Sequence, residues 1–322
     1  MPITINLSGT AAQGVNFNAD FASFFADLVP TGWPYILGGS GMFEGDQIVL
    51  LDEVEAGKES QTKAIILDGS AFEYYFNDHT LSGRLTAVRL STLGNSYDPA
   101  TQGFKQDGSG HITGVTTPIE ITGLNIYNAK RDRGDFHDTV YGLMGGSHED
   151  DGTAKPANLE RFLWAEAHVV NGSAGADFYS GSRFADTING NGGNDTLLGN
   201  AGNDRILGGA GNDSMAGGAG NDTIDGGAGT DTAVYSGTRS QYTITQTALG
   251  WTVADNRSGN SAEGTDLLIA VENVKFSDQT VVLTRPDTGN KAPVITSNGG
   301  GAAAAIRVAE NGTAVTTARA TD

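Results

Sequence analysis

A nine-residue repeat in the second half of the chain constrains the fold more than any other feature. The seventh position of every unit is aspartate, and the ninth is mostly apolar. Self-similarity at a fixed short period is typical of stacked repeat architectures, in which each unit contacts only its neighbours. Seven consecutive units run from Asn171 to Ala233: NGSAGADFY, SGSRFADTI, NGNGGNDTL, LGNAGNDRI, LGGAGNDSM, AGGAGNDTI and DGGAGTDTA.

Each residue type in the repeat suits one task. Glycine tolerates positive φ and lets backbone carbonyls turn towards a common point. Aspartate supplies a hard anionic oxygen, the kind of ligand that Ca²⁺ prefers. The apolar ninth residue closes a short strand whose side chain packs inside, so that two units make one 18-residue coil. We therefore predict calcium ligands at Asp186, Asp195, Asp204, Asp213, Asp222 and Asp231, with backbone carbonyls near Gly190, Gly192, Gly199, Gly208, Gly217 and Gly226.

The pattern Gly-Gly-x-Gly-x-Asp-x-apolar-x resembles the RTX (hemolysin-type) nonapeptide repeat, a calcium-binding parallel β-roll motif. Residues 189–231 match it strictly, whereas the first two units carry Ala176 and Arg183-Phe184-Ala185 in place of Gly-Asn and are expected to form a poorly occupied cap. The resemblance implies a secreted protein that leaves the cell unfolded by type I secretion and folds on extracellular Ca²⁺. Seven units in register disfavour the alternative of a disordered linker.

Composition and charge exclude several other classes of protein. The 322 residues carry 38 Asp and Glu against 19 Lys and Arg, and a chain of net charge −19 repels nucleic-acid phosphates. The absence of cysteine excludes disulfides, zinc sites with thiolate ligands and a cysteine nucleophile. The apolar runs are too short for a membrane span, and the N-terminus lacks the basic and apolar regions of a signal peptide. We expect an extracellular protein with no nucleic-acid partner.

The residues after the repeat divide into three segments. Alternating patterns in residues 234–284 predict short strands that cap the open end of the roll. Residues 285–293 have the composition of a Pro/Gly/polar linker. Residues 294–322, with Glu310-Asn311, resemble the truncated start of a cadherin-like β-sandwich, so we expect this chain to be part of a longer modular protein.

Residues 1–165 have the pattern of an ordinary globular domain. Its fold class is predicted as α+β, an antiparallel sheet with helices on one face, so the whole chain is predicted to be multidomain with an all-β second part. Helices are expected at Asn18–Val29, capped by Asn18 or Asp20, at Phe136–Met144 and at Asn158–His168. Strands are expected at Gln47–Leu51, Lys63–Leu67, Ala71–Asn77, Gly83–Leu90 and Pro118–Ile126.

Two stretches of this domain, Phe72–Leu85 and Phe136–Gly146, resemble the HasA-type haemophore family. In that family a tyrosine and a histidine bind haem iron, and a second histidine hydrogen-bonds the tyrosine. The resemblance implies that Tyr74 or Tyr75 is the haem ligand and that His79 is the assisting histidine. No histidine precedes His79, and Tyr35 is the nearest substitute for the missing ligand. The alternative is a packed strand with a structural histidine at its turn.

Motifs of secreted enzymes are missing from the sequence. His148-Glu149 is not followed by a second zinc-binding histidine, and there is no G-x-S-x-G nucleophile elbow. We therefore expect a non-catalytic, calcium-binding module of a larger surface or adhesion protein, with cell-surface or matrix partners. Two alternatives are a haem-binding protein and a fragment of an exported RTX hydrolase whose catalytic domain lies outside this chain.

Overall fold

The structure is a computed structural model, and its described residues form two compact units, Met1–Val282 and Leu283–Asp322. It describes residues 2–284 except 10–12, 27, 32–33, 42, 99, 102, 145–153 and 260–261, together with the backbone of 305–310 and 313–319. Most regular structure is β, with few helices, as the sequence predicts. None of the described helices is long and apolar enough to cross a membrane.

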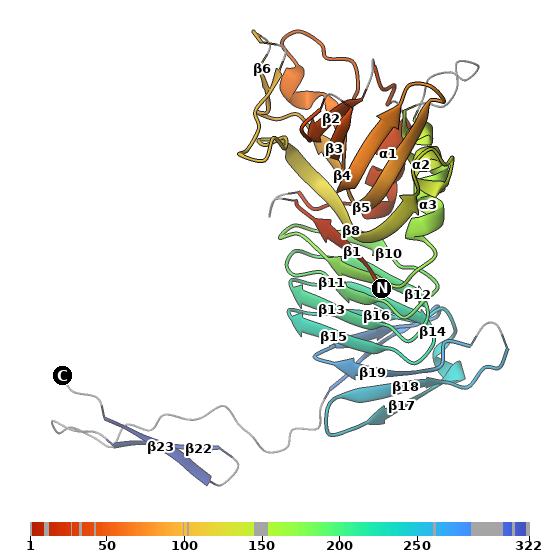
Figure 1. Cartoon of the computed structure of the whole chain (residues 1–322). Helices are drawn as coiled ribbons and strands as arrows, with labels where there is room; N and C mark the ends of the chain where they lie inside the picture. The colour runs from red at the N-terminus through yellow and green to blue at the C-terminus, as the bar shows by residue number, and fades with distance from the viewer. Residues whose placement is uncertain are drawn as a thin grey trace. The chain divides into compact units, whose positions relative to one another are not determined.

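The N-terminal part of the first unit is built on an antiparallel sheet with the strand order β1-β8-β5-β4-β3-β2 (Figure 1). The two predicted strands 63–67 and 71–77 are one long strand, because a bulge near Ala71 (φ 54°) lets the chain continue its pairing with β5. The strands are β1 (Ile3–Leu7), β2 (Tyr35–Gly38), β3 (Glu44–Leu51), β4 (Lys63–Tyr75), β5 (Thr80–Thr92) and β8 (Thr116–Asn128), with a small separate hairpin of β6 (Tyr97–Asp98) and β7 (Gly103–Phe104).

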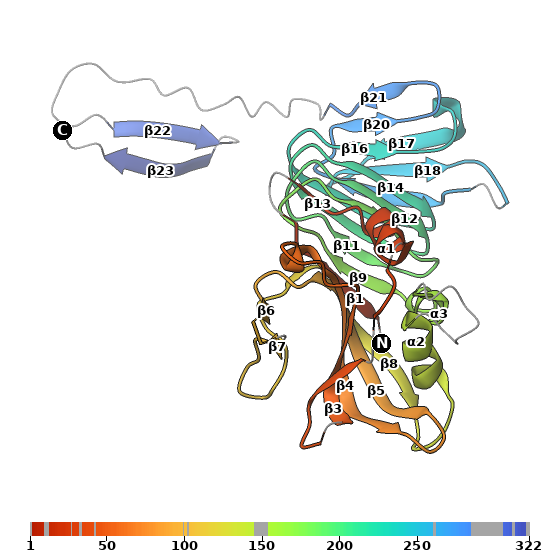
Figure 2. The same ribbon diagram turned by 90° about the horizontal axis from the view of Figure 1, so that it is seen from above.

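The described residues include three α-helices beside this sheet, α1 (Phe17–Ala26), α2 (Asp135–Leu143) and α3 (Ala157–Leu163). Helix α2 contacts β5 and β8 (Figure 2). Phe136 of this helix stacks on Phe72 with ring centroids 5.0 Å apart. The cap of α1 is Asn16 rather than Asn18 or Asp20, since its Oδ1 accepts the Ala19 N–H at 3.0 Å. Helix α3 ends at Leu163, not at His168, because His168 begins a strand.

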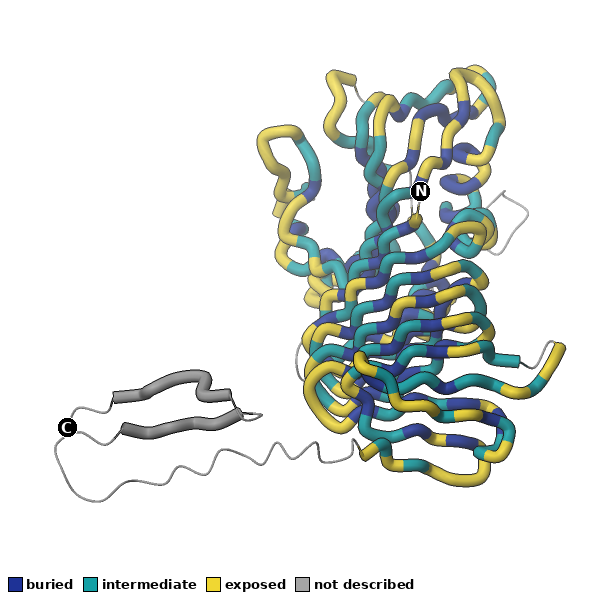
Figure 3. The backbone as a smooth tube through the Cα atoms, turned by 90° about the horizontal axis from the view of Figure 1, so that it is seen from below, coloured by how far each residue is buried: buried dark blue, intermediate teal, exposed yellow. Residues whose placement is uncertain are grey.

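The repeat units form parallel strands, as predicted. These strands lie in two sheets, in each of which a strand pairs with the one 18 residues further on. One sheet holds β9 (His168–Asn171), β11 (Thr187–Asn189), β13 (Arg205–Ala210) and β15 (Thr223–Ala228), and the other holds β10 (Phe178–Ser180), β12 (Thr196–Ala201), β14 (Ser214–Ala219) and β16 (Thr232–Val234). We call residues 168–234 the coil. Buried positions recur along each turn (Figure 3). The ninth-position side chains are all buried: Tyr179, Ile188, Leu197, Ile206, Met215, Ile224 and Ala233.

The N-terminal sheet and the coil are continuous. Strand β1 pairs antiparallel with β8 on one side and parallel with β9 on the other, so that a single sheet of 13 strands runs through both parts. Helix α1 contacts β10, where Asn18 receives the Ser180 N–H at 2.8 Å and donates to the Ser180 carbonyl at 3.3 Å. The boundary between the predicted N-terminal domain and the repeat is therefore formed by a paired strand, β9.

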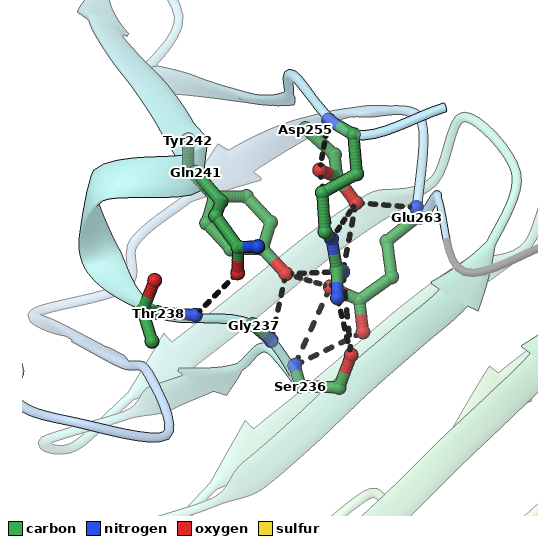
Figure 4. A network of polar contacts seen from close by, with 8 residues as sticks. Ser236, Gly237, Thr238, Gln241, Tyr242, Asp255 and Glu263 are labelled. Atoms are coloured by element: carbon green, nitrogen blue, oxygen red, sulfur yellow. Dashed lines mark hydrogen bonds and ion pairs between the residues drawn. The ribbon is translucent and has the colours of Figure 1, made fainter. Parts of the chain in front are cut away.

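The segment after the coil extends both sheets. Strand β19 (Thr265–Ile269) pairs parallel with β15, and β20 (Asn273–Lys275) pairs parallel with β16. Antiparallel strands β17 (Tyr242–Gln246), β18 (Trp251–Asp255) and β21 (Thr280–Val282) complete the sheets. The half-buried Arg257 guanidinium joins Asp255 at 2.8 Å and Glu263 at 3.0 Å, and it donates to the Tyr242 hydroxyl (Figure 4).

In the second unit, β22 (Ala305–Glu310) and β23 (Thr313–Arg319) form an antiparallel hairpin. The predicted linker 285–293 lies outside the described residues. Of the expected cadherin-like segment 294–322, the structure describes only the backbone of this hairpin.

The shared strand β1 gives a test of the junction. Ile5 is fully buried, so Ile5→Ala should lower the free energy of unfolding by about 2–5 kcal/mol, and Ile5→Val by about 1 kcal/mol. Urea denaturation in calcium-containing buffer, followed by circular dichroism, measures both values. A loss below about 0.5 kcal/mol for Ile5→Ala is typical of surface positions and would be inconsistent with this junction.

Candidate metal centre

The seventh-position aspartates lie in two buried rows, one before each stack of strands. Asp177, Asp195, Asp213 and Asp231 form one row, and Asp186, Asp204 and Asp222 form the other; all are at most 3 % exposed. Within a row, the Oδ1 of each aspartate accepts the backbone N–H of the aspartate one turn earlier. These hydrogen bonds, from Asp177 to Asp195 and from Asp204 to Asp222 for example, are 2.7–2.8 Å long.

Both rows continue into the segment after the coil. The Asp222 N–H donates to Asp266 Oδ1 at 2.9 Å, and the Asp231 N–H donates to Glu272 Oε2 at 2.8 Å. Sequence reasoning missed both residues. For Asp266 a signal existed, because Gly264-Thr265-Asp266 copies Gly229-Thr230-Asp231 of the last unit.

The second carboxylate oxygen of six of these aspartates is buried and has no hydrogen-bond partner. A buried acceptor without a partner is costly, and in a native structure it often marks an ion or water site. The six are Asp195, Asp204, Asp213, Asp222, Asp231 and Asp266.

Backbone carbonyls converge with these carboxylate oxygens in front of a glycine. A Cβ on Gly190 would stand 2.2 Å from Asp195 Oδ2 and 2.6 Å from the Gly208 carbonyl oxygen. Gly199 lies in the same way against Asp204 and the Gly217 carbonyl, and Gly208 against Asp213 and the Gly226 carbonyl. Only glycine leaves this space open, and oxygen atoms of two kinds face it, which fits Ca²⁺. Around Gly192 the nearest such atom, the Ala210 carbonyl oxygen, is 3.8 Å away.

Asp177 and Asp186 differ from the other aspartates, although Asp186 was predicted as a ligand like them. Asp186 Oδ2 accepts the Ser182 N–H at 2.7 Å, and its Oδ1 accepts the His168 N–H and the Ser182 hydroxyl. Ser173 makes the same two hydrogen bonds to Asp177. Both carboxylates are therefore satisfied by the protein itself.

Burial raises the pKa of the unpartnered carboxylates. It raises the pKa of Asp195 and Asp204 to about 7 and the pKa of Asp266 to about 8, because a charged carboxylate loses its hydration there. Desolvation also raises the pKa of Asp213, Asp222 and Asp231. A bound cation would compensate this loss of hydration. The described residues contain no cluster of three or more acidic, histidine or cysteine side chains suited to a metal, so a cation here depends on backbone carbonyls.

Exposed asparagine side chains at the sixth position of the unit link successive turns by hydrogen bonds. The Oδ1 atoms of Asn194, Asn203 and Asn212 accept the backbone N–H 18 residues further on at 2.7–2.8 Å, and Asn221 accepts that of Thr265 at 2.8 Å. This exposed ladder was not predicted, although the recurring Gly-Asn-Asp triplets were visible in the sequence.

The predicted haem residues lie at the turn between β4 and β5. The Tyr74 hydroxyl is 2.7 Å from His79 Nδ1, whereas the Tyr75 ring lies under the Arg131 guanidinium. Phe76 packs on Tyr74 with ring centroids 5.0 Å apart and is half exposed. Tyr35 belongs to β2, where its ring contacts Phe104. The structure thus brings together Tyr74 and His79, but not Tyr75.

Comparisons with known proteins agree with part of this description. Residues 171–206 and 198–233 match the family of the RTX calcium-binding nonapeptide repeat, so this segment consists of RTX repeats. The chain matches no curated protein sequence. Among solved structures, the holo form of the haemophore HasA from Yersinia pestis is similar at 15 % identity, over 49 % of this chain and 86 % of that chain, with a TM-score of 0.34. The AlgE6R3 subunit of the Azotobacter vinelandii mannuronan C5-epimerase is similar at 21 % identity, over 39 % of this chain and 90 % of that chain, with a TM-score of 0.18.

The raised pKa values predict the pH dependence of the metal-free coil. The folded state binds protons that the unfolded chain, with aspartate pKa values near 3.9, has already released. In EDTA the stabilisation is therefore complete below about pH 4 and is lost as the pH rises through about 7 to 8.

Far-ultraviolet circular dichroism in EDTA measures this effect. The β signal of the chain in EDTA should fall as the pH rises from 5 to 8, because the metal-free coil loses its protons and unfolds, whereas saturating Ca²⁺, which requires deprotonated carboxylates, should remove or reverse the trend. A β signal in EDTA that rises over the same interval would show that the carboxylates are not in the predicted environment.

Proposed function

We propose that this chain is the calcium-dependent folding module of a secreted protein and that its RTX repeats form a β-roll in the presence of extracellular Ca²⁺. The observation that carries the proposal is the set of buried, unpartnered Oδ2 atoms of Asp195, Asp204, Asp213, Asp222 and Asp231. These five aspartates recur at nine-residue intervals in a segment that matches a family of calcium-binding repeats.

Without a cation, units three to seven of the coil have few stabilising interactions. An unsatisfied buried acceptor costs about 1–3 kcal/mol, and more if it is charged. The side chains between the sheets are single apolar residues, such as Ile206 and Met215, while much of the rest is glycine. Glycine-rich strands lose more conformational entropy on folding and bury less apolar surface than other strands.

Calcium would supply the missing positive charge and accept oxygen ligands from two successive turns. The residues that would hold it are the five aspartates together with the carbonyls of Gly208, Gly217, Gly226 and Ala270, which lie beside the glycines of the preceding turn. Because these oxygens come together only in the folded coil, the free energy of calcium binding becomes free energy of folding.

This arrangement suits export in the unfolded state followed by folding outside the cell. Cytosolic calcium is too low to occupy weak sites, whereas extracellular modules bind it with dissociation constants of about 10⁻⁴–10⁻³ M. We propose type I secretion, a place in a larger surface or adhesion protein, and a partner on a cell surface or matrix. The N-terminal α+β part and the segment 234–284 would then close the two ends of the roll.

A calcium titration of the full chain tests the folding proposal. Far-ultraviolet circular dichroism should show a gain of β signal as Ca²⁺ rises to about 10 mM. Asp204→Asn should shift the midpoint to higher calcium, because it removes a charged ligand. Asp132→Asn is the control that removes the same charge outside the coil, and it should leave the midpoint unchanged, since Asp132 is exposed and lies before α2.

Two results would refute the proposal: no gain of β signal up to about 10 mM Ca²⁺, or equal shifts for both variants.

The contact between Tyr74 and His79 favours haem binding as a second function. A phenolate is a known haem ligand, and an imidazole that accepts the phenol proton would favour it. Burial raises the pKa of Tyr74, so the histidine is needed for proton removal near neutral pH. Half-exposed Phe76 and neighbouring Phe43, whose ring centroids are 4.4 Å apart, offer an apolar surface for a porphyrin beside this pair.

Hemin titration of the full chain, followed at the Soret band, tests this second function. Tyr74→Phe should abolish the shifted band, while Tyr75→Phe should retain it, because only Tyr74 contacts His79. His79→Ala should weaken binding by about tenfold or more, the range seen when a partner of a metal ligand is removed. The absence of a shifted band, or a band unaffected by Tyr74→Phe, would exclude the assignment.

A further inference from the structure

The seven repeat units are of two kinds, which differ at the third position. Units three to seven carry asparagine or glycine there, and each of these residues has positive φ: Asn191, Asn200, Gly209, Gly218 and Gly227. Units one and two carry Ser173 and Ser182, and neither has positive φ. Units one and two also carry alanine immediately before the aspartate. Units three to six carry asparagine at that position, and unit seven carries threonine.

The partner of the third-position N–H differs between the units without positive φ and unit three. In the first two units this N–H donates to the aspartate Oδ2, at 2.5 Å from Ser173 to Asp177 and at 2.7 Å from Ser182 to Asp186. In unit three, by contrast, the Asn191 N–H donates to the side chain of Asn189, and Asp195 Oδ2 keeps no partner. The same oxygen that is satisfied by the backbone in units one and two is therefore left for a cation from unit three onwards.

The serine hydroxyls make further hydrogen bonds within these two turns. Each hydroxyl donates to the Oδ1 of its aspartate at 2.8 Å and accepts a backbone N–H two residues further on, that of Gly175 or Phe184. Such a ring of hydrogen bonds satisfies the carboxylate and the turn without any metal. The carboxylate oxygen that faces Gly172 or Gly181 is Oδ2, and it accepts the serine N–H, whereas the corresponding Oδ2 in the other units has no partner.

The N-terminal part of the chain holds the same two turns. Asp177 Oδ1 accepts the Val15 N–H at 2.5 Å, and Asp186 Oδ1 accepts at 2.7 Å the N–H of His168, the first residue of β9, which pairs with β1 of the N-terminal sheet. The ring of Tyr179, the core residue of unit one, packs on Phe17 of α1 with ring centroids 5.5 Å apart. These contacts are made by ordinary apolar packing and hydrogen bonds, so they do not depend on calcium.

We propose that units one and two fold without metal, with Ser173 and Ser182 in the place of calcium, and that they form with the N-terminal part a template on which the calcium-dependent units fold. This inference rests on the proposed calcium-dependent folding and adds which units of the coil fold without calcium. Folding of the coil then proceeds from unit three onwards, against an edge that β11 and β10 already present.

Hydrogen exchange of the full chain, measured by mass spectrometry in EDTA and in 10 mM Ca²⁺, tests the template. In EDTA, residues 168–189 should exchange at least about tenfold more slowly than residues 198–228, and calcium should slow the second segment to the level of the first. Equal, fast exchange of both segments in EDTA would overturn the template. Slow exchange of both in EDTA, with no effect of calcium, would instead overturn the proposed function.

A comparison of serines tests the role of the hydroxyl. Ser182→Ala should accelerate exchange of residues 180–189 in EDTA by about tenfold, which corresponds to one lost hydrogen bond to a charged group. Ser214→Ala in β14 is the matched control, because its hydroxyl makes none of these hydrogen bonds, and it should change nothing in EDTA. Equal effects of the two variants would contradict the proposal.

Counting bound calcium by native mass spectrometry gives an independent test. Asp186→Asn should bind as many calcium ions as the wild-type chain, whereas Asp204→Asn should bind one fewer. Loss of an ion in Asp186→Asn would show that unit two is a calcium site and that the serine does not replace the metal.

Discussion

The structure depends on one recurring constraint, the burial of a carboxylate in every turn of a glycine-rich coil. In units three to seven, Oδ1 of each aspartate accepts the backbone N–H of the aspartate one turn earlier, which keeps successive turns in register. Oδ2 of the same carboxylate has no hydrogen-bond partner. Since so little apolar surface is buried per turn, the coil has few other interactions with which to offset this deficit, and its stability is tied to whatever occupies the open oxygens.

At the beginning of the coil the carboxylates are satisfied by the protein itself, whereas at the other end the rows continue outside the repeat, where Asp266 Oδ2 again has no partner. At the beginning, serine hydroxyls and backbone N–H groups complete the carboxylates, and β1 joins the first turn to the N-terminal sheet. At the other end, Asp266 and Glu272 continue the hydrogen-bond rows, and the strands that carry them cover the last turns. Close by, the Arg257 guanidinium compensates Asp255 and Glu263, so a protein cation is used where the repeat has ended. We propose that calcium dependence is concentrated in units three to seven.

The strict period made much of the coil predictable from the sequence. The ninth-position core, the buried aspartates and the pairing of strands 18 residues apart all follow from it, because every unit has the same surroundings. The degenerate sequence of the first two units predicted a poorly occupied cap, but the way in which Asp186 is satisfied was not predictable, since it depends on the φ of Ser182 four positions earlier. Asp266 was missed because the β17–β18 hairpin separates it from the repeat. The pairing of β1 with β9 joins residues more than 160 positions apart, and no local pattern announces it.

We propose that calcium occupies the unpartnered Oδ2 atoms of units three to seven and does not bind in units one and two. A crystal structure of the full chain grown in calcium, with anomalous scattering data, locates the ions. We expect anomalous peaks about 2.3–2.6 Å from Oδ2 of Asp195, Asp204, Asp213, Asp222 and Asp231, and none beside Asp177 and Asp186. Calcium-saturated crystals without peaks at the five aspartates, or with peaks at the first two, would contradict it.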